Sequence, residues 1–185
     1  IKIYNLGNET EIRQTEEYVM KKIKLGYVPT RRSIFSAPDA VKYRRLTADR
    51  LTELGIDFVD ITDINEEGLL YDDQDVEKIA EKFEKEGVDG LMLGIVISEP
   101  SMSVQDWQNG SDFRYCFGGP LDERPEPNGE RLRDTQCGLF ATGKVLRDSG
   151  VSFDILDELS LKRSGFSSAA YGDFLAVCNV VKTFK

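Results

Sequence analysis

The chain has 185 residues, of which 40% are hydrophobic and 31% charged, and its formal net charge is −9. This composition is typical of one soluble globular domain with a sizeable core. The negative charge argues against nucleic acid and anionic membrane as partners, because both attract basic surfaces. No apolar run approaches the length of a membrane span and the N-terminus lacks a signal-peptide pattern, so we expect a cytoplasmic protein.

The sequence contains no histidine. This excludes Ser-His-Asp and Cys-His catalysis within the chain and removes the commonest transition-metal ligand. The three cysteines, Cys116, Cys137 and Cys178, are far apart and form no Cys-X-X-Cys pair, so neither a zinc site nor a disulfide framework is indicated. We therefore assign no catalytic residue and no metal ligand in this chain.

The first half of the chain alternates between strand and helix patterns. A β-branched and aromatic run predicts a strand at 22–29 that ends at Pro29. Ser36 is placed to cap a helix that ends at Gly55, with Asp39 placed to reach back to the cap. The further elements are a strand at 56–61, a helix at 72–87 and a strand at 88–94. This β-α-β-α-β order predicts a parallel sheet with right-handed crossovers.

The second half is less regular. Residues 95–118 hold no apolar period, no helix cap and no clear turn chemistry, and 120–132 is a polar, proline-rich loop. Beyond it, the pattern predicts a helix capped by Asp134 and closed by Gly150. A last amphipathic helix is predicted at 173–184.

Two glycine motifs were considered for phosphate or dinucleotide binding. The run "GLFATGKV" at 138–145 looks superficially like a P-loop, but no Ser or Thr follows Lys144 and the run does not lie between a strand and a helix N-terminus. A helix interior with two tolerated glycines is the favoured interpretation. No Gly-X-Gly-X-X-Gly fingerprint is present, so the sequence does not indicate a dinucleotide site.

The run "PTRR" at 29–32 is the best-placed candidate binding motif. Thr30, Arg31 and Arg32 follow the first predicted strand, where open α/β sheets bind ligands. Two adjacent guanidinium groups there can hold hydroxyls or an anion. The alternative is a solvated basic turn that offsets acidic neighbours, and the sequence alone favours this alternative.

Two weaker candidates are a helix start and an acidic segment. At 133–138, the free N–H groups near Asp134, Thr135 and Gln136 can meet a ligand oxygen, although a plain capping motif is favoured. The segment 63–75 clusters carboxylates, but acidic residues ahead of a helix are usually a solvated start that the helix dipole favours. A metal site there is disfavoured.

Four stretches resemble the N-terminal part of the L-fucose/L-arabinose isomerase-like family, in word order and not merely in fold. They are "MKKIKLGYVPTRRSIFS" (20–36), "DINEEGLLYDDQDVEKIAEKFEKEGVDGLMLG" (63–94), "GPLDERPEPNGERLRDTQCGLFATGKVL" (119–146) and "FLAVCNVVKTFK" (174–185). The resemblance implies a single α/β domain over residues 20–185. Its parallel sheet would be Rossmann- or flavodoxin-like, as in the N-terminal domain of a sugar isomerase, and incomplete.

Members of this family are cytoplasmic oligomers that interconvert an aldose and a ketose through an ene-diol. A divalent metal, typically Mn²⁺, polarises the sugar oxygens while a carboxylate moves a proton between neighbouring carbons. The family's metal ligands come from later domains, and this chain ends before them, so the resemblance implies that the chain alone does not isomerise a sugar. The N-terminal domain shapes assembly and can reach a neighbouring subunit's sugar site, for which Arg31 and Arg32 are the implied contacts.

The family pattern breaks at 95–118. Where the family continues with a His-Cys-Asn-Phe-Gly-Thr-Glu-like run, a helix and an apolar strand ending in Trp-Gly-Pro, back-translation one base out of frame permits "HCNFGTEYVCARLAKRIGLPVLLWG", which runs into Pro120. We therefore hypothesise that one base is lost near Gly94 and one gained near Gly118 or Gly119. As written, residues 95–118 are expected to be irregular, with an exposed sheet edge beside them. The aromatic residues expected outside the core are Trp107, Phe113, Tyr115 and Phe117.

Two further segments depart from the family. Met20 fits the usual family start, and Glu16-Glu17 can be encoded by a ribosome-binding-like sequence. Residues 1–19 are therefore expected to be a leader-like extension. Residues 156–172 also depart from the family, without a resolved alternative frame.

Three alternatives to an N-terminal isomerase domain stay open. The chain can be a stand-alone sugar- or anion-binding α/β module that uses Arg31 and Arg32, and measurable sugar binding by the chain alone would favour this. It can be a subunit-interface fragment, and a folded oligomer that binds no sugar would support this. It can also be a non-functional gene remnant, which predicts an aggregating product.

Overall fold

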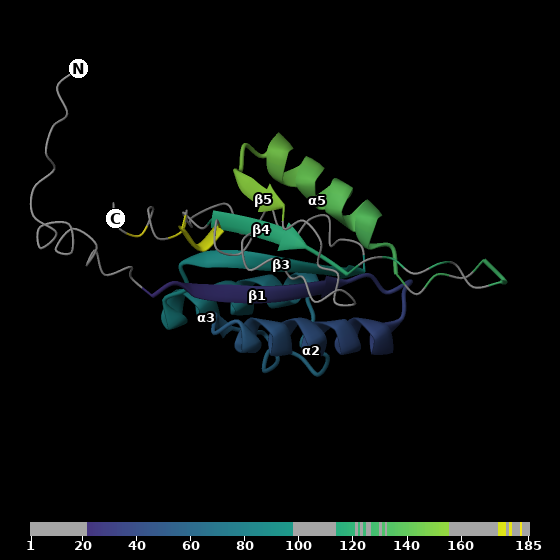
Figure 1. Cartoon of the computed structure of the whole chain (residues 1–185), viewed down its shortest axis with the longest axis horizontal. Helices are drawn as coiled ribbons and strands as arrows, with labels where there is room; N and C mark the ends of the chain where they lie inside the picture. Colours follow the sequence, from purple (N-terminus) through teal and green to yellow (C-terminus); the bar gives the residue numbers. More distant parts are fainter. Residues whose placement is uncertain are drawn as a thin grey trace, which may run out of the picture.

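The computed structural model describes residues 22–97, 114–120, 122, 124, 127–129, 131, 133–155, 174–176, 178 and 182. Its five strands are all parallel and lie in the order β2-β1-β3-β4-β5. Figure 1 shows β1, β3, β4 and β5 in this order. The strands are β1 (Lys24–Arg31), β2 (Asp57–Val59), β3 (Gly90–Ile97), β4 (Arg114–Gly118) and β5 (Phe153–Ile155). The helices are α2 (Ala37–Glu53), the 3₁₀ turn η1 (Asp73–Asp75), α3 (Val76–Glu86) and α5 (Thr135–Asp148). The predicted α/β class is confirmed, and the strand order is that of flavodoxin-like doubly wound sheets.

Strand β1 begins and ends two residues later than the sequence predicts, because Pro29 does not end it. Leu70 N donates to Pro29 O at 2.8 Å, so the polar backbone groups of Pro29 face the side of β2. Strand β2 has already ended there, since its last partner on β1 is Gly26. The missing N–H of proline therefore removes no ladder hydrogen bond, and the strand continues to Arg31.

Helices α2 and α3 form where the sequence predicts them, with one difference at a cap. Ser36 caps α2 by accepting a hydrogen bond from Asp39 N at 3.2 Å. Asp39 does not reach back to this cap, because its carboxylate accepts from Arg133 instead. Gly87 ends α3 in the left-handed conformation, with φ of 66°, which a residue without Cβ adopts at no steric cost.

The segment expected to be irregular contains strand structure. Residues 95–97 continue β3, and 114–118 form β4, which pairs with β3 from Gly90↔Arg114 to Gly94↔Gly118. The expectation of an exposed edge at β3 was therefore wrong. Tyr115 and Phe117 are buried, contrary to prediction, because alternate residues of a central strand point into the core. Trp107 and Phe113 lie outside the described residues.

Strand β5 was not predicted from the sequence. Its three residues pair with β4 and form the edge of the sheet, and a three-residue strand leaves too short a pattern to detect. The last predicted helix is confirmed at the positions described, which are 174–176, 178 and 182. Segments 1–19 and 156–172 lie outside the described residues. None of the helices among the described residues combines the length and apolarity needed to cross a membrane.

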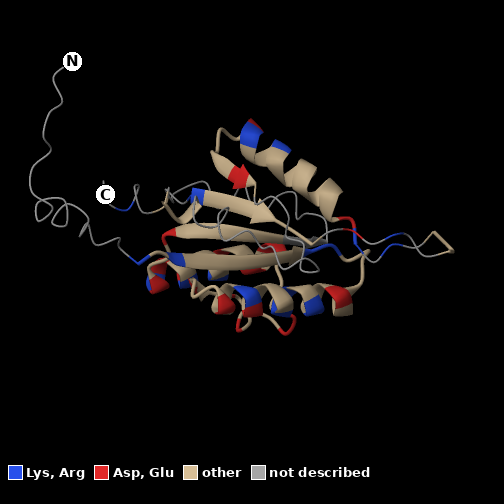
Figure 2. Cartoon of the chain, in the orientation of Figure 1, with Lys and Arg blue, Asp and Glu red and all other residues tan. Residues whose placement is uncertain are grey.

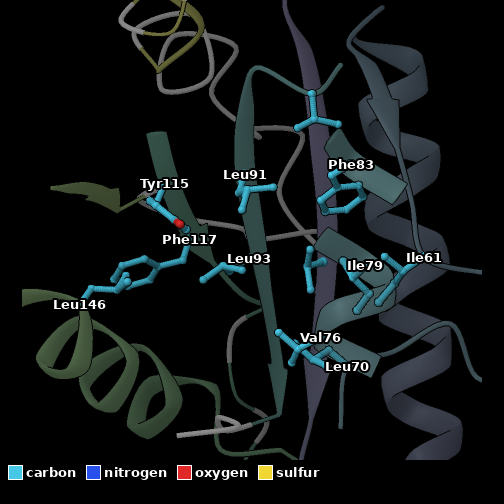
Figure 3. Close-up of a cluster of buried hydrophobic side chains, with 12 residues drawn as sticks. Ile61, Leu70, Val76, Ile79, Phe83, Leu91, Leu93, Tyr115, Phe117 and Leu146 are labelled. Carbon is cyan, nitrogen blue, oxygen red and sulfur yellow. The ribbon is translucent and has the colours of Figure 1, made fainter. Parts of the chain in front are cut away.

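Side chains of the strands alternate between two apolar clusters, one on each face of the sheet. One cluster joins the strands to α3 and α5 (Figure 3) and contains Val28, Leu91, Leu93, Phe117, Ile79, Phe83 and Leu146. The other joins them to α2 and the C-terminal helical residues and contains Leu25, Tyr27, Met92, Cys116, Leu51, Phe174 and Cys178. Burial on both faces explains the continuous apolar runs of β1 and β3.

Candidate functional site at the carboxyl edge of the sheet

The strand order reverses at β1, which places a candidate binding position at the carboxyl ends of β1 and β3. The chain leaves β1 for β2 on one side and later returns to β3 on the other. Thr30 pairs with Ile95 and Arg31 with Ile97, and the register shifts between these two pairs. Open α/β sheets bind ligands at this position, because the connections diverge there. Thr30, Arg31 and Arg32 therefore lie where the sequence predicts a site, although Thr30 and Arg31 belong to the strand itself.

The loop after β2 is fastened to the end of β1. Arg31 N donates to Leu70 O at 3.1 Å, which extends the sheet by an isolated parallel bridge between Thr30 and Leu70. Asn65 holds the loop from within, since its amide donates to Leu69 O and to the Asp75 carboxylate, both within 2.9 Å. The loop is therefore a fixed wall beside the carboxyl end of β1.

Arg31 is bound tightly by this wall. Its Nε donates to Glu67 Oε2 at 2.5 Å and its Nη2 to Glu67 Oε1 at 2.8 Å, which is a bidentate pair. The guanidinium also lies over Tyr71, with 4.5 Å between Cζ and the ring centre. Only 12% of the Arg31 side chain is exposed. Arg31 is thus a partly buried, charge-compensated group and not the free cation that the sequence suggests.

Arg32 differs from Arg31 in its exposure and in its lack of side-chain partners among the described residues. It is exposed, and its side chain makes no hydrogen bond or ion pair with another residue in the described part of the chain. Charged residues lie mainly on the helices and at strand ends, while the strands between them are largely uncharged (Figure 2). The loop that follows Arg32 carries Ile34, whose side chain is 72% exposed. Arg32 is therefore the more accessible of the two arginines.

The start of α5 is occupied by a side chain from its own chain. The Asp122 carboxylate accepts from Thr135 N at 2.7 Å and from Gln136 N at 3.1 Å. Asp134 occupies the N-cap position of α5, as predicted, but its side chain makes no capping hydrogen bond. A hydrogen bond from Cys137 to Asp134 instead raises the pKa of the Cys137 thiol. The amides near Asp134, Thr135 and Gln136 already hold an anionic group, which leaves less capacity for a ligand.

The glycine motif at 138–145 lies inside α5, as the sequence predicts, with Gly138 and Gly143 buried.

The acidic side chains of segment 63–75 take part in local hydrogen bonds and ion pairs. The Asp63 carboxylate pairs with Lys82, which lowers the pKa of Asp63, and Asp72 caps η1. Among the described residues no group of three or more His, Cys, Asp or Glu side chains is arranged to hold a metal ion. The donor set of this part of the chain therefore does not fit a divalent metal.

Sequence reasoning missed Glu67, Tyr71 and Asp122. Glu67 and Tyr71 flank Leu69 and Leu70, both fully buried. An apolar pair inside an acidic run is a signal that the run folds against the core, so that its neighbours lie at the rim. The position of Asp122 depends on a loop that crosses to the start of α5, for which the local sequence contains no signal.

Comparison with known proteins supports the resemblance seen in the sequence. A family model described as the N-terminal domain of fucose/sulfoquinovose isomerase matches residues 26–185. A search of curated proteins found no match.

Proposed function

Because the chain belongs to the family of fucose/sulfoquinovose isomerase N-terminal domains, we propose that it supplies a sugar-contacting wall to an aldose–ketose isomerase of carbohydrate metabolism. The observation that carries this proposal is the exposed Arg32 at the carboxyl end of β1, beside the reversal of strand order. A guanidinium there can donate several hydrogen bonds to sugar hydroxyls. Thr30 and Arg31, the other two predicted contacts, lie at the same strand end. There Thr30 Oγ1 donates a hydrogen bond to Gly94 O at 3.4 Å.

The chemistry of isomerisation belongs to residues outside this chain in our proposal. A divalent metal, Mn²⁺ by resemblance, would polarise the sugar oxygens when bound to the parent enzyme. The described residues offer no donor set that fits it, so no step of this chain is routed through a metal. What this chain does is orient the sugar by hydrogen bonds, and it is inactive alone.

The parent enzyme is proposed to be a cytoplasmic homo-oligomer. The resemblance to the family, whose members are oligomers, supports this part of the proposal. The net charge of −9 argues against nucleic acid and anionic membrane as partners. Asp134, Thr135 and Gln136 stay second-tier candidates for this contact.

Sugar binding to the chain alone tests the sugar contact at Arg32, which this proposal shares with the stand-alone binding module. Saturation-transfer NMR with L-fucose should give a signal for the wild-type chain and lose most of it in Arg32→Ala. The matched control is Arg45→Ala, which removes an exposed arginine from the middle of α2 and should leave the signal unchanged. Equal signals from the two variants would show that Arg32 is no contact.

An activity assay tests the remaining part. The chain, incubated with L-fucose and Mn²⁺, should form no ketose above the level of a metal-only control. Ketose formed in proportion to the chain concentration would contradict the assignment of catalysis to residues outside it.

A further inference from the structure

The family description joins a neutral sugar, fucose, to sulfoquinovose, whose sulfonate is anionic near neutral pH. The two substrates demand different electrostatics from the wall that contacts them. A neutral sugar is recognised by donors and acceptors without net charge, whereas a sulfonate favours an uncompensated cation. The charge balance around Arg31 and Arg32 therefore bears on which sugar this chain takes.

Arg31 presents no net charge to a ligand. Both of its hydrogen bonds to Glu67 are charge-assisted, and the two side chains are 12% and 26% exposed. Opposite charges this close act on a third group as a dipole, so their attraction for an anion falls off faster with distance than that of a single cation. The partial burial keeps the pair together, because separating it would leave a poorly solvated charge.

The pair still offers hydrogen bonds suited to a polyol. A guanidinium has five N–H donors, and Glu67 takes two of them, which leaves three. Tyr71 covers one face of the group, so these donors are presented along its edge. The Glu67 oxygens keep free lone pairs beside them. Adjacent donors and acceptors match neighbouring hydroxyl groups, which both donate and accept.

The rest of the loop adds negative charge. Glu66 and Asp72 are exposed on either side of Glu67 and Tyr71. Arg32 is the one exposed cation of the "PTRR" motif in the described residues, and solvent screens a single exposed charge. Glu66 and Asp72 therefore make the loop beside the Arg31–Glu67 pair net negative, which disfavours an anion next to this pair.

We propose that this edge selects a neutral aldose over an acidic sugar and that Glu67 is the residue that makes the selection. The inference rests on the sugar-binding function proposed above and specifies its substrate class. Glu67 acts by cancelling the charge of Arg31, so removal of its charge should open the site to acidic sugars.

The test compares L-fucose with sulfoquinovose on the full chain by saturation-transfer NMR with competition, at low and high salt. The wild type should bind L-fucose more tightly. Glu67→Gln, which keeps the size of the side chain, should gain about fivefold in sulfoquinovose affinity at low salt. The gain should vanish at high salt. Glu66→Gln removes the same charge from an exposed neighbour without touching Arg31 and should gain much less.

The outcomes separate the two proposals. A wild type that binds neither sugar contradicts the proposed function and this inference with it. A wild type that binds L-fucose but takes sulfoquinovose equally well or better overturns the inference alone, even if Glu67→Gln does not fold. Equal gains in Glu67→Gln and Glu66→Gln also overturn it, because selection would then follow total charge and not the Arg31 pair.

Discussion

Arg133 Nη1 donates a 2.7 Å hydrogen bond to Asp39 Oδ2, and the Arg133 guanidinium lies 4.2 Å from the centre of the Tyr43 ring. The Arg133 and Asp39 side chains are 5% and 12% exposed. The pair joins the first turn of α2 to the residue just ahead of α5, 94 positions away in sequence. It therefore fastens the loop before α5 to the same edge of the sheet as the candidate site.

Asp39→Asn should destabilise the fold strongly. The change removes the Asp39 charge that pairs with the buried Arg133, and breaking a buried ion pair costs about 3–5 kcal/mol. Urea denaturation measures the loss in the free energy of unfolding. Asp49→Asn, an exposed position on the same helix, should change it by less than about 0.5 kcal/mol. Similar losses in the two variants would mean that the pair contributes little.

Asp122→Ala should weaken α5 more than Asp134→Ala. Asp122 accepts from two backbone amides at the start of the helix, and loss of such a cap costs about 1 kcal/mol. Asp134 makes no capping bond from its side chain. Thermal unfolding followed by circular dichroism compares the two variants. A larger loss in Asp134→Ala would restore the cap that the sequence predicts.

Asp75 should make the free energy of unfolding depend on pH. Its carboxylate accepts from Asn65 and Lys78, and these bonds lower its pKa below the ordinary 3.8, with Asn65 as the larger cause. A carboxyl with a lower pKa folded than unfolded stabilises the fold above its unfolded pKa and loses that contribution as pH falls through the folded value.

Asp75→Asn should therefore cost on the order of 1 kcal/mol at neutral pH, and the deficit against wild type should shrink as the pH falls below about 4. Urea titrations at several pH values measure it. Glu77→Gln, an exposed neighbour, serves as the control. A deficit that does not change with pH would assign the effect to packing and not to the charge.

The three thiols should react in a fixed order. Cys137 is exposed, whereas burial raises the pKa of Cys116 well above its ordinary value and that of Cys178 to about 12. Because the thiolate is the nucleophile, a disulfide reagent should label Cys137 in the native chain and the other two only on unfolding. Asp134 raises the pKa of Cys137, so Asp134→Asn should increase its labelling rate at pH 8. Unchanged labelling would show that this hydrogen bond is weak in solution.

The frame hypothesis for residues 95–118 is tested on the DNA. If the shift arose in reading the gene, resequencing from codon 85 to past codon 185 should add one base near Gly94 and remove one near Gly118 or Gly119. The strand "LPVLLWG" of the shifted reading would occupy 113–119, which overlaps β4 at Arg114–Gly118. A sequence that agrees with the present reading would leave "RYCFG" as β4 and confine the hypothesis to a change in the gene itself.

Most of the fold was predictable where local signals were strong. The cap at Ser36, the left-handed Gly87 and the apolar runs of β1 and β3 are set by residues a few positions apart, so α2, α3 and the parallel sheet could be expected from the sequence. Strand β4 was missed because "RYCFG" was judged against a family pattern and not by its own alternation. As written, Tyr115 and Phe117 face one cluster and Cys116 the other.

The sequence by itself determined the class of this protein: a family N-terminal domain with a basic motif at the end of its first strand, in a chain without histidine. Only the tertiary structure decided how the two arginines of that motif differ. Glu67 and Tyr71 reach Arg31 across 36 and 40 residues because Leu70 pairs with the end of β1, while Arg32 points to solvent. Partners so far apart in sequence leave no local pattern, since the fold alone brings them within hydrogen-bonding distance.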